Sequence, residues 1–206
     1  MSFPRLYAIL DVEYTSSVGR DPLTVASTFF SAGVRLIQVR SKALGSGALL
    51  ELSCQVVEAA RPHGAIVIVN DRPDIAVLAC AAGVHVGQED LPPDAVRRVM
   101  PDGIVGLSTH TREQFELALA TPATYLAVGP VFGTSTKDTG YAAVGLDLLM
   151  WAARRSDRPV VAIGGITLDN IAEVFAAGAS SAAVISDLVR GDPRERARAM
   201  VARAAG

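Results

Sequence analysis

Two lysines stand out in a chain that otherwise carries its positive charges on arginine. Of the 19 basic residues 17 are arginines, and the lysines are Lys42 in QVRSK and Lys137 in GTSTKD. Lysine is a compact ammonium on a flexible stem, whereas arginine is a planar fork. A site that holds a phosphate oxygen or a leaving group at one point favours the compact charge. The two stretches are therefore candidates for an anion site, the alternative being that the lysines fall there by chance.

The stretch QVRSK places polar side chains on alternate residues. Gln38, Arg40 and Lys42 share one face if the stretch is extended, because side chains alternate across a strand. If that face looks into a barrel mouth, an amide and two cations converge there, which suits a polyanion such as a pyrophosphate. The alternative is the solvated end of a strand. The neighbouring polar loops favour the anion site.

Two carboxylates follow neighbouring apolar stretches. Asp71 ends AIVIVND, and Asp90 comes shortly after VHVGQ. Mg²⁺ takes a few protein oxygen ligands together with substrate phosphate, so two carboxylates opposite a pyrophosphate site fit this ion. The alternative for both is helix capping, ahead of Pro73 and Pro92 respectively. Asn70, one of only two asparagines in the chain, slightly favours the functional interpretation.

A second anion site is indicated by loops in the last part of the chain. GTSTKD offers two threonine hydroxyls and a glycine whose backbone is open to a ligand. Two later apolar stretches end in glycine or serine. Such loops bind phosphate through backbone N–H groups, often with a short extra helix, here expected at 186–190. In GTSTKD the candidate anion-binding residues are Thr134, Thr136 and Lys137, and in the two later loops, on which the second anion site is built, they are Gly165, Ile185 and Ser186. The alternatives are a polar surface loop and a tight strand-to-helix turn.

The histidines give weaker signals. His63 precedes an expected strand and so lies at the wrong end for chemistry, and His85 lies inside a strand, where a satisfied core residue is expected. His110 is better placed, close to Ser108, but no His/Cys metal spacing accompanies it.

Short apolar runs alternate with longer alanine-rich runs along the chain. The expected strands are 6–11, 34–40, 65–71, 84–88, 103–109, 124–130, 159–165 and 181–186. The expected helices are 22–32, 46–60, 73–82, 91–100, 112–120, 146–155, 169–177 and 193–204. Eight strand–helix units predict an α/β fold, a closed (β/α)₈ barrel, with residues 1–206 as a single domain. The alternative is an open sheet with one unit miscounted.

The polar residues singled out above fall almost entirely at the carboxyl ends of the expected strands. Active sites of (β/α)₈ barrels lie at that end, so this asymmetry indicates an enzyme. The net charge of −2 with scattered charges argues against a nucleic-acid binder. The uncharged segment 117–136 contains prolines and glycines that make it a poor membrane span. With no visible signal peptide and two cysteines expected to be buried thiols, we expect a cytoplasmic protein.

Seven stretches taken together resemble the thiamine phosphate synthase family, over almost the whole chain. They are QVRSK, VNDRPDIA, GVHVGQEDLP, GLSTHT, GPVFGTSTK, AIGGI and VIS. The resemblance implies a (β/α)₈ barrel and a transferase. Such an enzyme joins 4-amino-2-methyl-5-hydroxymethylpyrimidine diphosphate to 4-methyl-5-(2-phosphooxyethyl)thiazole, giving thiamine phosphate and pyrophosphate with the help of Mg²⁺.

The resemblance also implies roles for individual residues. The pyrimidine diphosphate would be held by Gln38, Arg40, Lys42, Asn70, Ser108 and Lys137. The thiazole phosphate would be held by Thr134, Thr136, Gly165, Ile185 and Ser186. Asp71 and Asp90 would bind Mg²⁺, while Arg40, Lys42 and Lys137 would surround the departing pyrophosphate. Ser41 departs from the acidic residue usual in the family, and strand alternation points it away from its polar neighbours.

Three other functions are kept as alternatives. A thiazole tautomerase of the same barrel type would use the thiazole phosphate site, with His110 moving a proton. A non-catalytic sensor of thiamine precursors would bind without turnover. A phosphosugar isomerase rests on the fold alone. In each case the expected partners are small molecules, with no nucleic acid and no membrane, and a homodimer is left open.

Overall fold

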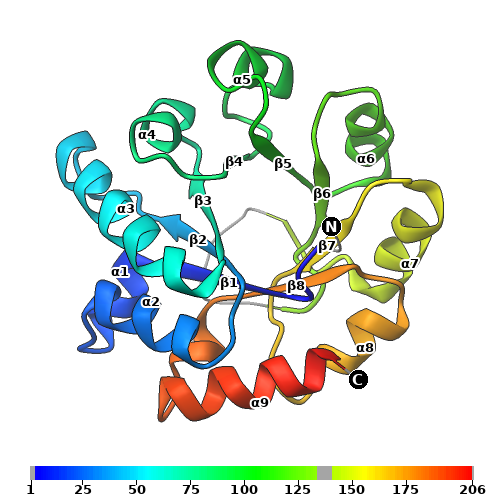
Figure 1. Cartoon of the computed structure of the whole chain (residues 1–206). Coiled ribbons are helices and arrows are strands. Elements are labelled where there is room, and N and C mark those ends of the chain that lie inside the picture. Colours follow the sequence, from blue (N-terminus) through cyan, green and yellow to red (C-terminus); the bar gives the residue numbers. More distant parts are fainter. Residues whose placement is uncertain (1–2, 134–140, 206) are drawn as a thin grey trace.

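Eight parallel strands close into a barrel in the computed structural model, which describes residues 3–133 and 141–205. Neighbouring strands pair in chain order, and the last pairs with the first. Figure 1 shows the barrel in the middle of the molecule with the helices around it. The predicted (β/α)₈ barrel is therefore confirmed, and the open sheet is excluded.

The strands are short and almost wholly buried. They are β1 (Leu6–Asp11), β2 (Leu36–Arg40), β3 (Ile66–Asn70), β4 (Gly83–Val86), β5 (Ile104–Thr109), β6 (Tyr125–Val128), β7 (Val160–Ile163) and β8 (Ser181–Val184). Their apolar runs follow from burial on both faces, against the barrel interior and against the helices. Several end earlier than predicted, because the last residues of each apolar run already turn toward the following helix.

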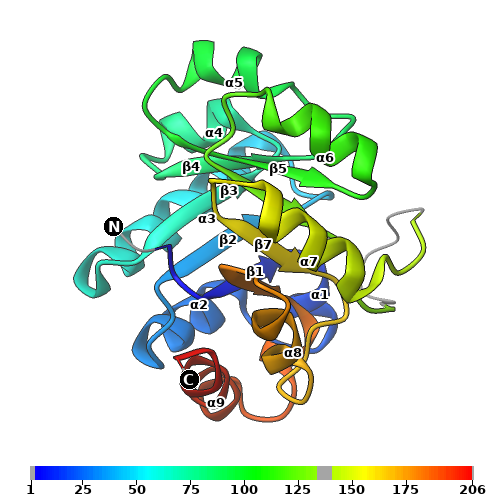
Figure 2. The ribbon, with the colours of Figure 1, turned by 90° about the vertical axis from the view of Figure 1, so that its right-hand side faces the viewer.

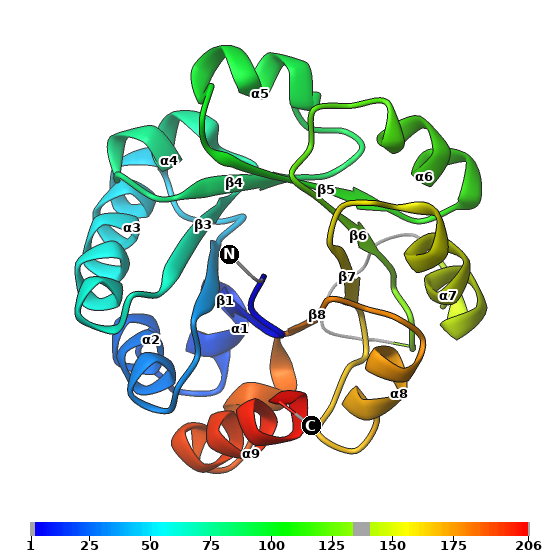
Figure 3. The same cartoon turned by 45° about the vertical axis from the view of Figure 1, so that its right-hand side comes forward.

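A ring of helices covers the barrel. They are α1 (Val12–Ser17), α2 (Pro22–Ser31), α3 (Ser46–Ala60), α4 (Pro73–Leu78), α5 (Pro93–Val99), α6 (Arg112–Leu119), α7 (Gly145–Arg155), α8 (Ile171–Ala176) and α9 (Pro193–Ala205). Two short 3₁₀ turns join them, η1 (Arg61–His63) and η2 (Ser186–Val189). Figure 3 shows the helices arranged around the barrel, with α9 between α2 and α8. None of the helices in these described ranges is long and apolar enough to cross a bilayer.

The buried apolar residues form two cores. The outer core joins the strands to the helices and contains most of the valines, leucines and alanines. The inner core fills the barrel, and its two largest side chains are Tyr7 and Tyr125. A Cβ on Gly106 would lie 2.1 Å from the Tyr125 ring and 2.4 Å from His85 Nδ1. Glycine at 106 therefore makes room for these two side chains to meet inside the barrel.

Two expectations were wrong in detail. Helix α1 follows β1 directly and was not predicted, and Figure 2 shows it at the end of the barrel opposite the N-terminus. The cysteines are not both buried thiols, because Cys54 is half-buried and Cys80 is exposed. Cys80 lies in the turn after α4 with a positive φ of 54°, outside the helix assigned to it.

Candidate active site

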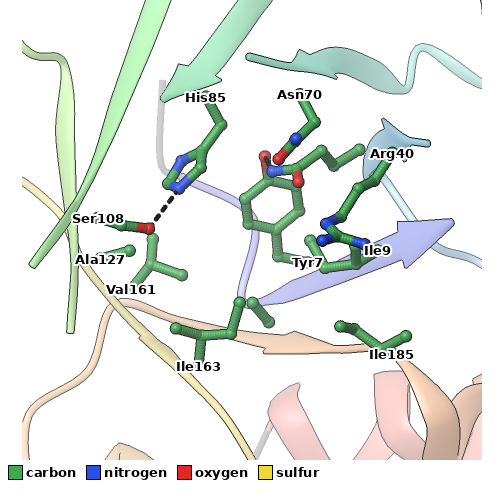
Figure 4. A pocket seen from close by; sticks show the side chains of 12 residues that line it. Tyr7, Ile9, Arg40, Asn70, His85, Ser108, Ala127, Val161, Ile163 and Ile185 are labelled. Carbon is green, nitrogen blue, oxygen red and sulfur yellow. Dashed lines mark hydrogen bonds between the residues drawn. The ribbon is translucent and has the colours of Figure 1, made fainter. Parts of the chain in front are cut away.

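A cavity opens at the carboxyl ends of the strands. Five of the predicted site residues line it, namely Gln38, Arg40, Asn70, Ser108 and Ile185. Its remaining walls are mostly apolar, from the inner core, with Tyr7 and His85 as the further polar members. Figure 4 shows these side chains converging on one space from several strands. The structure thus brings residues that are far apart in the sequence to one mouth.

A chain of hydrogen bonds crosses the floor of this cavity. Gln38 Nε2 donates to the Tyr7 hydroxyl at 2.8 Å, and the Tyr7 and Tyr125 hydroxyls are 2.9 Å apart. His85 then joins Tyr125 to Ser108, with Nδ1 at 2.8 Å from the Tyr125 hydroxyl and Nε2 at 2.8 Å from Ser108 Oγ. Sequence reasoning placed only Gln38 and Ser108 in the site. Tyr7, Tyr125 and His85 connect these two residues through hydrogen bonds.

One assignment of donors and acceptors satisfies every group of this hydrogen-bonded chain, which we call the relay. Because Gln38 donates to Tyr7, the Tyr7 hydroxyl can donate to the Tyr125 hydroxyl. The Tyr125 hydroxyl can in turn donate to His85 Nδ1. His85 then carries its proton on Nε2 and donates to Ser108. Burial raises the pKa of both tyrosines well above the usual value, so the hydroxyls keep their protons. The carbonyl oxygen of Gln38 and the hydroxyl proton of Ser108 stand at the two ends.

Removing the central hydroxyl should destabilise the protein. In Tyr125→Phe the Tyr7 hydroxyl and His85 Nδ1 lose the group that joins them, inside a fully buried site. We expect the free energy of unfolding to fall by about 1–3 kcal/mol, the usual cost of a broken buried hydrogen bond. Urea denaturation measures this, with Tyr141→Phe as the exposed control. Equal stability of Tyr125→Phe and wild type would contradict the relay.

Arg40 is held at the cavity wall by a buried ion pair. Its guanidinium pairs with Asp11, whose side chain is also buried. Arg40 Nε is buried and has no hydrogen-bond partner among the described residues. A buried donor without a partner is costly, and Arg40 lines the cavity, so this nitrogen is suited to an anionic ligand.

Lys42, Asp71 and Asp90 lie together at the rim. Lys42 Nζ is 2.5 Å from Asp71 Oδ2, and Asp90 Oδ2 accepts a hydrogen bond from Gly87 N at 2.7 Å. Burial and the neighbouring Asp71 carboxyl raise the pKa of Asp90 above its usual value, against the lowering effect of the Gly87 hydrogen bond. A cation between the two carboxyl groups would favour the charged form of Asp90.

The capping alternative for these two aspartates is wrong. Helix α4 begins after Arg72 and α5 after Pro92, and neither has a side-chain cap. Asp71 instead adopts the left-handed conformation, with φ 61°, and its N–H donates to His85 O at 2.7 Å. In the described ranges no three His, Cys, Asp or Glu side chains gather as a metal cage. A pair of carboxylates is nevertheless what Mg²⁺ uses when substrate phosphate supplies further oxygens.

The loop after β7 is built tightly against the base of the loop after β6. Gly165 has φ 63°, and a Cβ there would lie 2.5 Å from Gly133 O. Only glycine fits this approach. Asn170 donates to Gly165 O at 3.0 Å, which fixes the turn. Ser186 begins η2, the short helix predicted in this place, directly after Ile185.

Three predicted site residues, Thr134, Thr136 and Lys137, lie outside the described residues. His110, the residue behind the tautomerase alternative, is described. Its Nδ1 is 2.5 Å from Gly129 O, and its ring stacks on Tyr141 with a centroid separation of 4.1 Å. The hydrogen bond to Gly129 and the stacking on Tyr141 together fix the orientation of the imidazole.

The fold and the site together define a (β/α)₈-barrel enzyme with its polar residues at the carboxyl ends of the strands. Residues 6–188 match the family described as thiamine monophosphate synthase. The chain is 41% identical to the thiamine-phosphate synthase of Koribacter versatilis, over 96% of this chain and 94% of that protein. It is 44% identical to the thiamine-phosphate synthase of Anaeromyxobacter dehalogenans, over 89% and 83%.

A solved structure agrees with the sequence relatives. The thiamine phosphate pyrophosphorylase from Pyrococcus furiosus superposes with a TM-score of 0.90 at 28% identity, covering 98% of this chain and 96% of that one. The chain therefore belongs to the thiamine monophosphate synthase family. Family membership makes it an enzyme of thiamine biosynthesis, of the transferase type, with thiamine-phosphate synthase as its class of activity.

Proposed function

We propose that the barrel mouth transfers an aminopyrimidine methylene group from a diphosphate to the ring nitrogen of a thiazole monophosphate. The products are thiamine phosphate and pyrophosphate. The observation that carries this proposal is the position of one cavity, lined by Gln38 and Ser108, beside a rim that holds cations and paired carboxylates. The apolar wall of the cavity suits an uncharged ring, and the charged groups of the rim suit a diphosphate.

The pyrimidine ring is proposed to lie in the cavity. Ile9, Val161 and Ile163 provide apolar wall for its faces. Gln38 and Ser108 provide an acceptor and a donor, which match an exocyclic amino group and a ring nitrogen. The relay through Tyr7, Tyr125 and His85 fixes both groups before the substrate arrives.

The diphosphate is proposed to lie against Arg40, Lys42, Asn70 and Lys137. Arg40 Nε is the buried donor that lacks a partner among the described residues. Lys42, two residues after the end of β2, places its ammonium group at the rim. Charge-assisted hydrogen bonds of this kind are short and strong. Lys42 would exchange its contact with Asp71 for the phosphate oxygens.

Asp71 and Asp90 are proposed to hold Mg²⁺, as the chemistry of this carboxylate pair allows. When bound, the ion would neutralise charge on the diphosphate oxygens. The thiazole phosphate is proposed to bind at the second anion site, through Gly165, Ile185 and Ser186, together with Thr134 and Thr136. The tight packing around Gly165 supports a preformed backbone cradle there.

The reaction then needs positioning more than proton transfer. The bond between the pyrimidine methylene carbon and the diphosphate oxygen breaks, and its electron pair leaves with pyrophosphate. Arg40, Lys42 and Lys137 stabilise that charge, while the electron-rich aminopyrimidine stabilises the cation left behind. The thiazole nitrogen donates its lone pair to the methylene carbon, which closes the new C–N bond. No proton is taken up or released on the thiazole, so a general base is not required.

Removing divalent metal should stop turnover. Purified protein mixed with both substrates and Mg²⁺ is expected to form thiamine phosphate, and a chelator should lower the rate by about 100-fold or more, because charge on the leaving group is then poorly neutralised. Excess Mg²⁺ should restore the rate. A rate unaffected by chelator would contradict the metal role of Asp71 and Asp90. No product from intact substrates would favour the tautomerase or the sensor.

A further inference from the structure

Helix α1 turns an acidic side chain toward the loop that carries the cations. This cation loop comprises residues 40–44. Glu13, in the first turn of α1, accepts hydrogen bonds from the Ser41 hydroxyl and from Ala43 N at 3.3 Å through Oε1. Its Oε2 accepts from Lys42 N at 3.2 Å. One carboxylate thus holds three consecutive residues of the cation loop.

The helix itself is tied to the same loop. Asp11 Oδ1 caps α1 by accepting from Tyr14 N at 2.9 Å, and Asp11 Oδ2 pairs with Arg40. The position of Glu13 is therefore set by the residue that also holds Arg40. The Asp11–Arg40 ion pair crosses from the end of β1 to the end of β2, where the two residues are in register.

The cation loop depends on these acceptors. Ser41 Oγ accepts from Ala43 N at 3.3 Å and from Leu44 N at 3.0 Å, while its own proton goes to Glu13. Burial acts to raise the pKa of Glu13, but the hydrogen bonds from Ser41, Lys42 and Ala43 outweigh it, so the pKa lies below its usual value. The carboxylate is charged at neutral pH, and charge-assisted bonds to it are the stronger kind.

We propose that Glu13 is a positioning residue that fixes the backbone of the cation loop so that Arg40 and Lys42 meet the diphosphate. The proposal rests on the proposed function of those two residues. The Glu13 carboxylate accepts a hydrogen bond from the backbone N–H of Lys42, whereas the ammonium group of Lys42 contacts Asp71 at the rim. The loop is therefore held without using up the charge that would bind the substrate.

Positioning and simple electrostatics predict opposite results for the loss of Glu13. A negative charge near the cation loop repels an anionic substrate, so its removal alone should tighten binding of the diphosphate. Loss of positioning should weaken that binding, because the cations then have to be ordered by the substrate itself. The sign of the change in KM separates the two.

The experiment measures KM for each substrate in wild type, Glu13→Ala and the control Glu51→Ala, whose side chain is exposed on α3. Glu13→Ala is expected to raise KM for the pyrimidine diphosphate about tenfold, the size of a lost charge-assisted interaction, with KM for the thiazole phosphate within about twofold of wild type. Ser41→Asp, which sets a second carboxylate against Glu13, should raise the same KM. Glu13→Gln combined with Ser41→Asp should restore it, because the amide can donate to the new carboxylate.

Three results would overturn the proposal. They are an unchanged or lower KM for the diphosphate in Glu13→Ala, an equal rise in both KM values, and a failure of the double variant to recover. If Glu13→Ala does not fold, Ser41→Asp and its rescue still decide the question. A wild type that makes no product would instead overturn the proposed function, so the two failures are distinguishable.

Discussion

Asp71→Asn is expected to lower turnover by about 100- to 1,000-fold while the protein stays folded, which is the cost of losing one preorganised charge contact at a reacting centre. Asparagine tolerates the left-handed backbone that Asp71 adopts, with φ 61°, so the substitution removes charge without adding strain. The Lys42 side chain is 58% exposed, so its contact with Asp71 contributes little to stability. Steady-state kinetics with both substrates and saturating Mg²⁺ measure the effect.

The matched control is Asp94→Asn, on the exposed side of α5. It should keep the wild-type rate. A normal rate for Asp71→Asn would remove Asp71 from the metal site, whatever the chelator experiment shows. A low rate with an unfolded far-ultraviolet spectrum would instead show that Asp71 is a structural residue.

The largest effect on stability is expected at Asp187. This carboxylate is 2% exposed, receives Arg196 Nη2 at 2.8 and 2.7 Å on its two oxygens, and accepts from Leu168 N at 2.9 Å. It joins η2 to α9 and to the loop after β7. In Asp187→Ala a largely buried guanidinium loses its partner, so we expect the free energy of unfolding to fall by about 3–5 kcal/mol. Urea denaturation measures it.

Asp74→Ala is the control for this prediction. Asp74 pairs with Arg72 at 2.6 Å, but both side chains are exposed, so its loss should change stability by about 1 kcal/mol or less. Because Asp187 adjoins Ser186, any folded Asp187 variant should bind the thiazole phosphate more weakly than wild type does. Its binding of the pyrimidine diphosphate should change less. If Asp187→Ala and Asp74→Ala cost the same, the buried ion pair does not hold these loops together.

The barrel could be predicted because its signals are local and repeated. Each apolar run and each alanine-rich run has a length typical of one element, and eight repeats leave few other arrangements. Helix α1 was not predicted, because VEYTSS is only six residues long and is too short to show a helical repeat of apolar residues. Asp11, its capping residue, was read as the last residue of a strand, which it also is.

The candidate site was predicted from polar residues at or near the carboxyl ends of strands. Gln38, Arg40 and Asn70 were identified in this way and Ser108 through the family resemblance, and all four line one cavity. The relay was missed because Tyr7 and Tyr125 are 118 residues apart and each reads as an apolar core residue. His85 was expected to be a satisfied core residue. Both ring nitrogens have partners, as that interpretation requires, but one partner is Ser108 at the cavity.

Ser41 shows how much depends on a neighbouring element. Strand alternation correctly points it away from the cavity that Gln38 and Arg40 line. What it contacts there, the carboxylate of Glu13, could not be known without α1. A sequence signal existed only in part, as an acidic residue just after β1 and a hydroxyl residue just after β2.

The most direct test of the account is a crystal structure of the protein with Mg²⁺, pyrophosphate and thiamine phosphate. The account predicts the pyrimidine ring between Gln38 and Ser108, and pyrophosphate against Arg40, Lys42 and Lys137. It also predicts the metal between Asp71 and Asp90, and the thiazole phosphate at Gly165 and Ser186. Pyrophosphate or metal bound away from these residues, at full occupancy in an active crystal, would contradict the assignment of the barrel mouth.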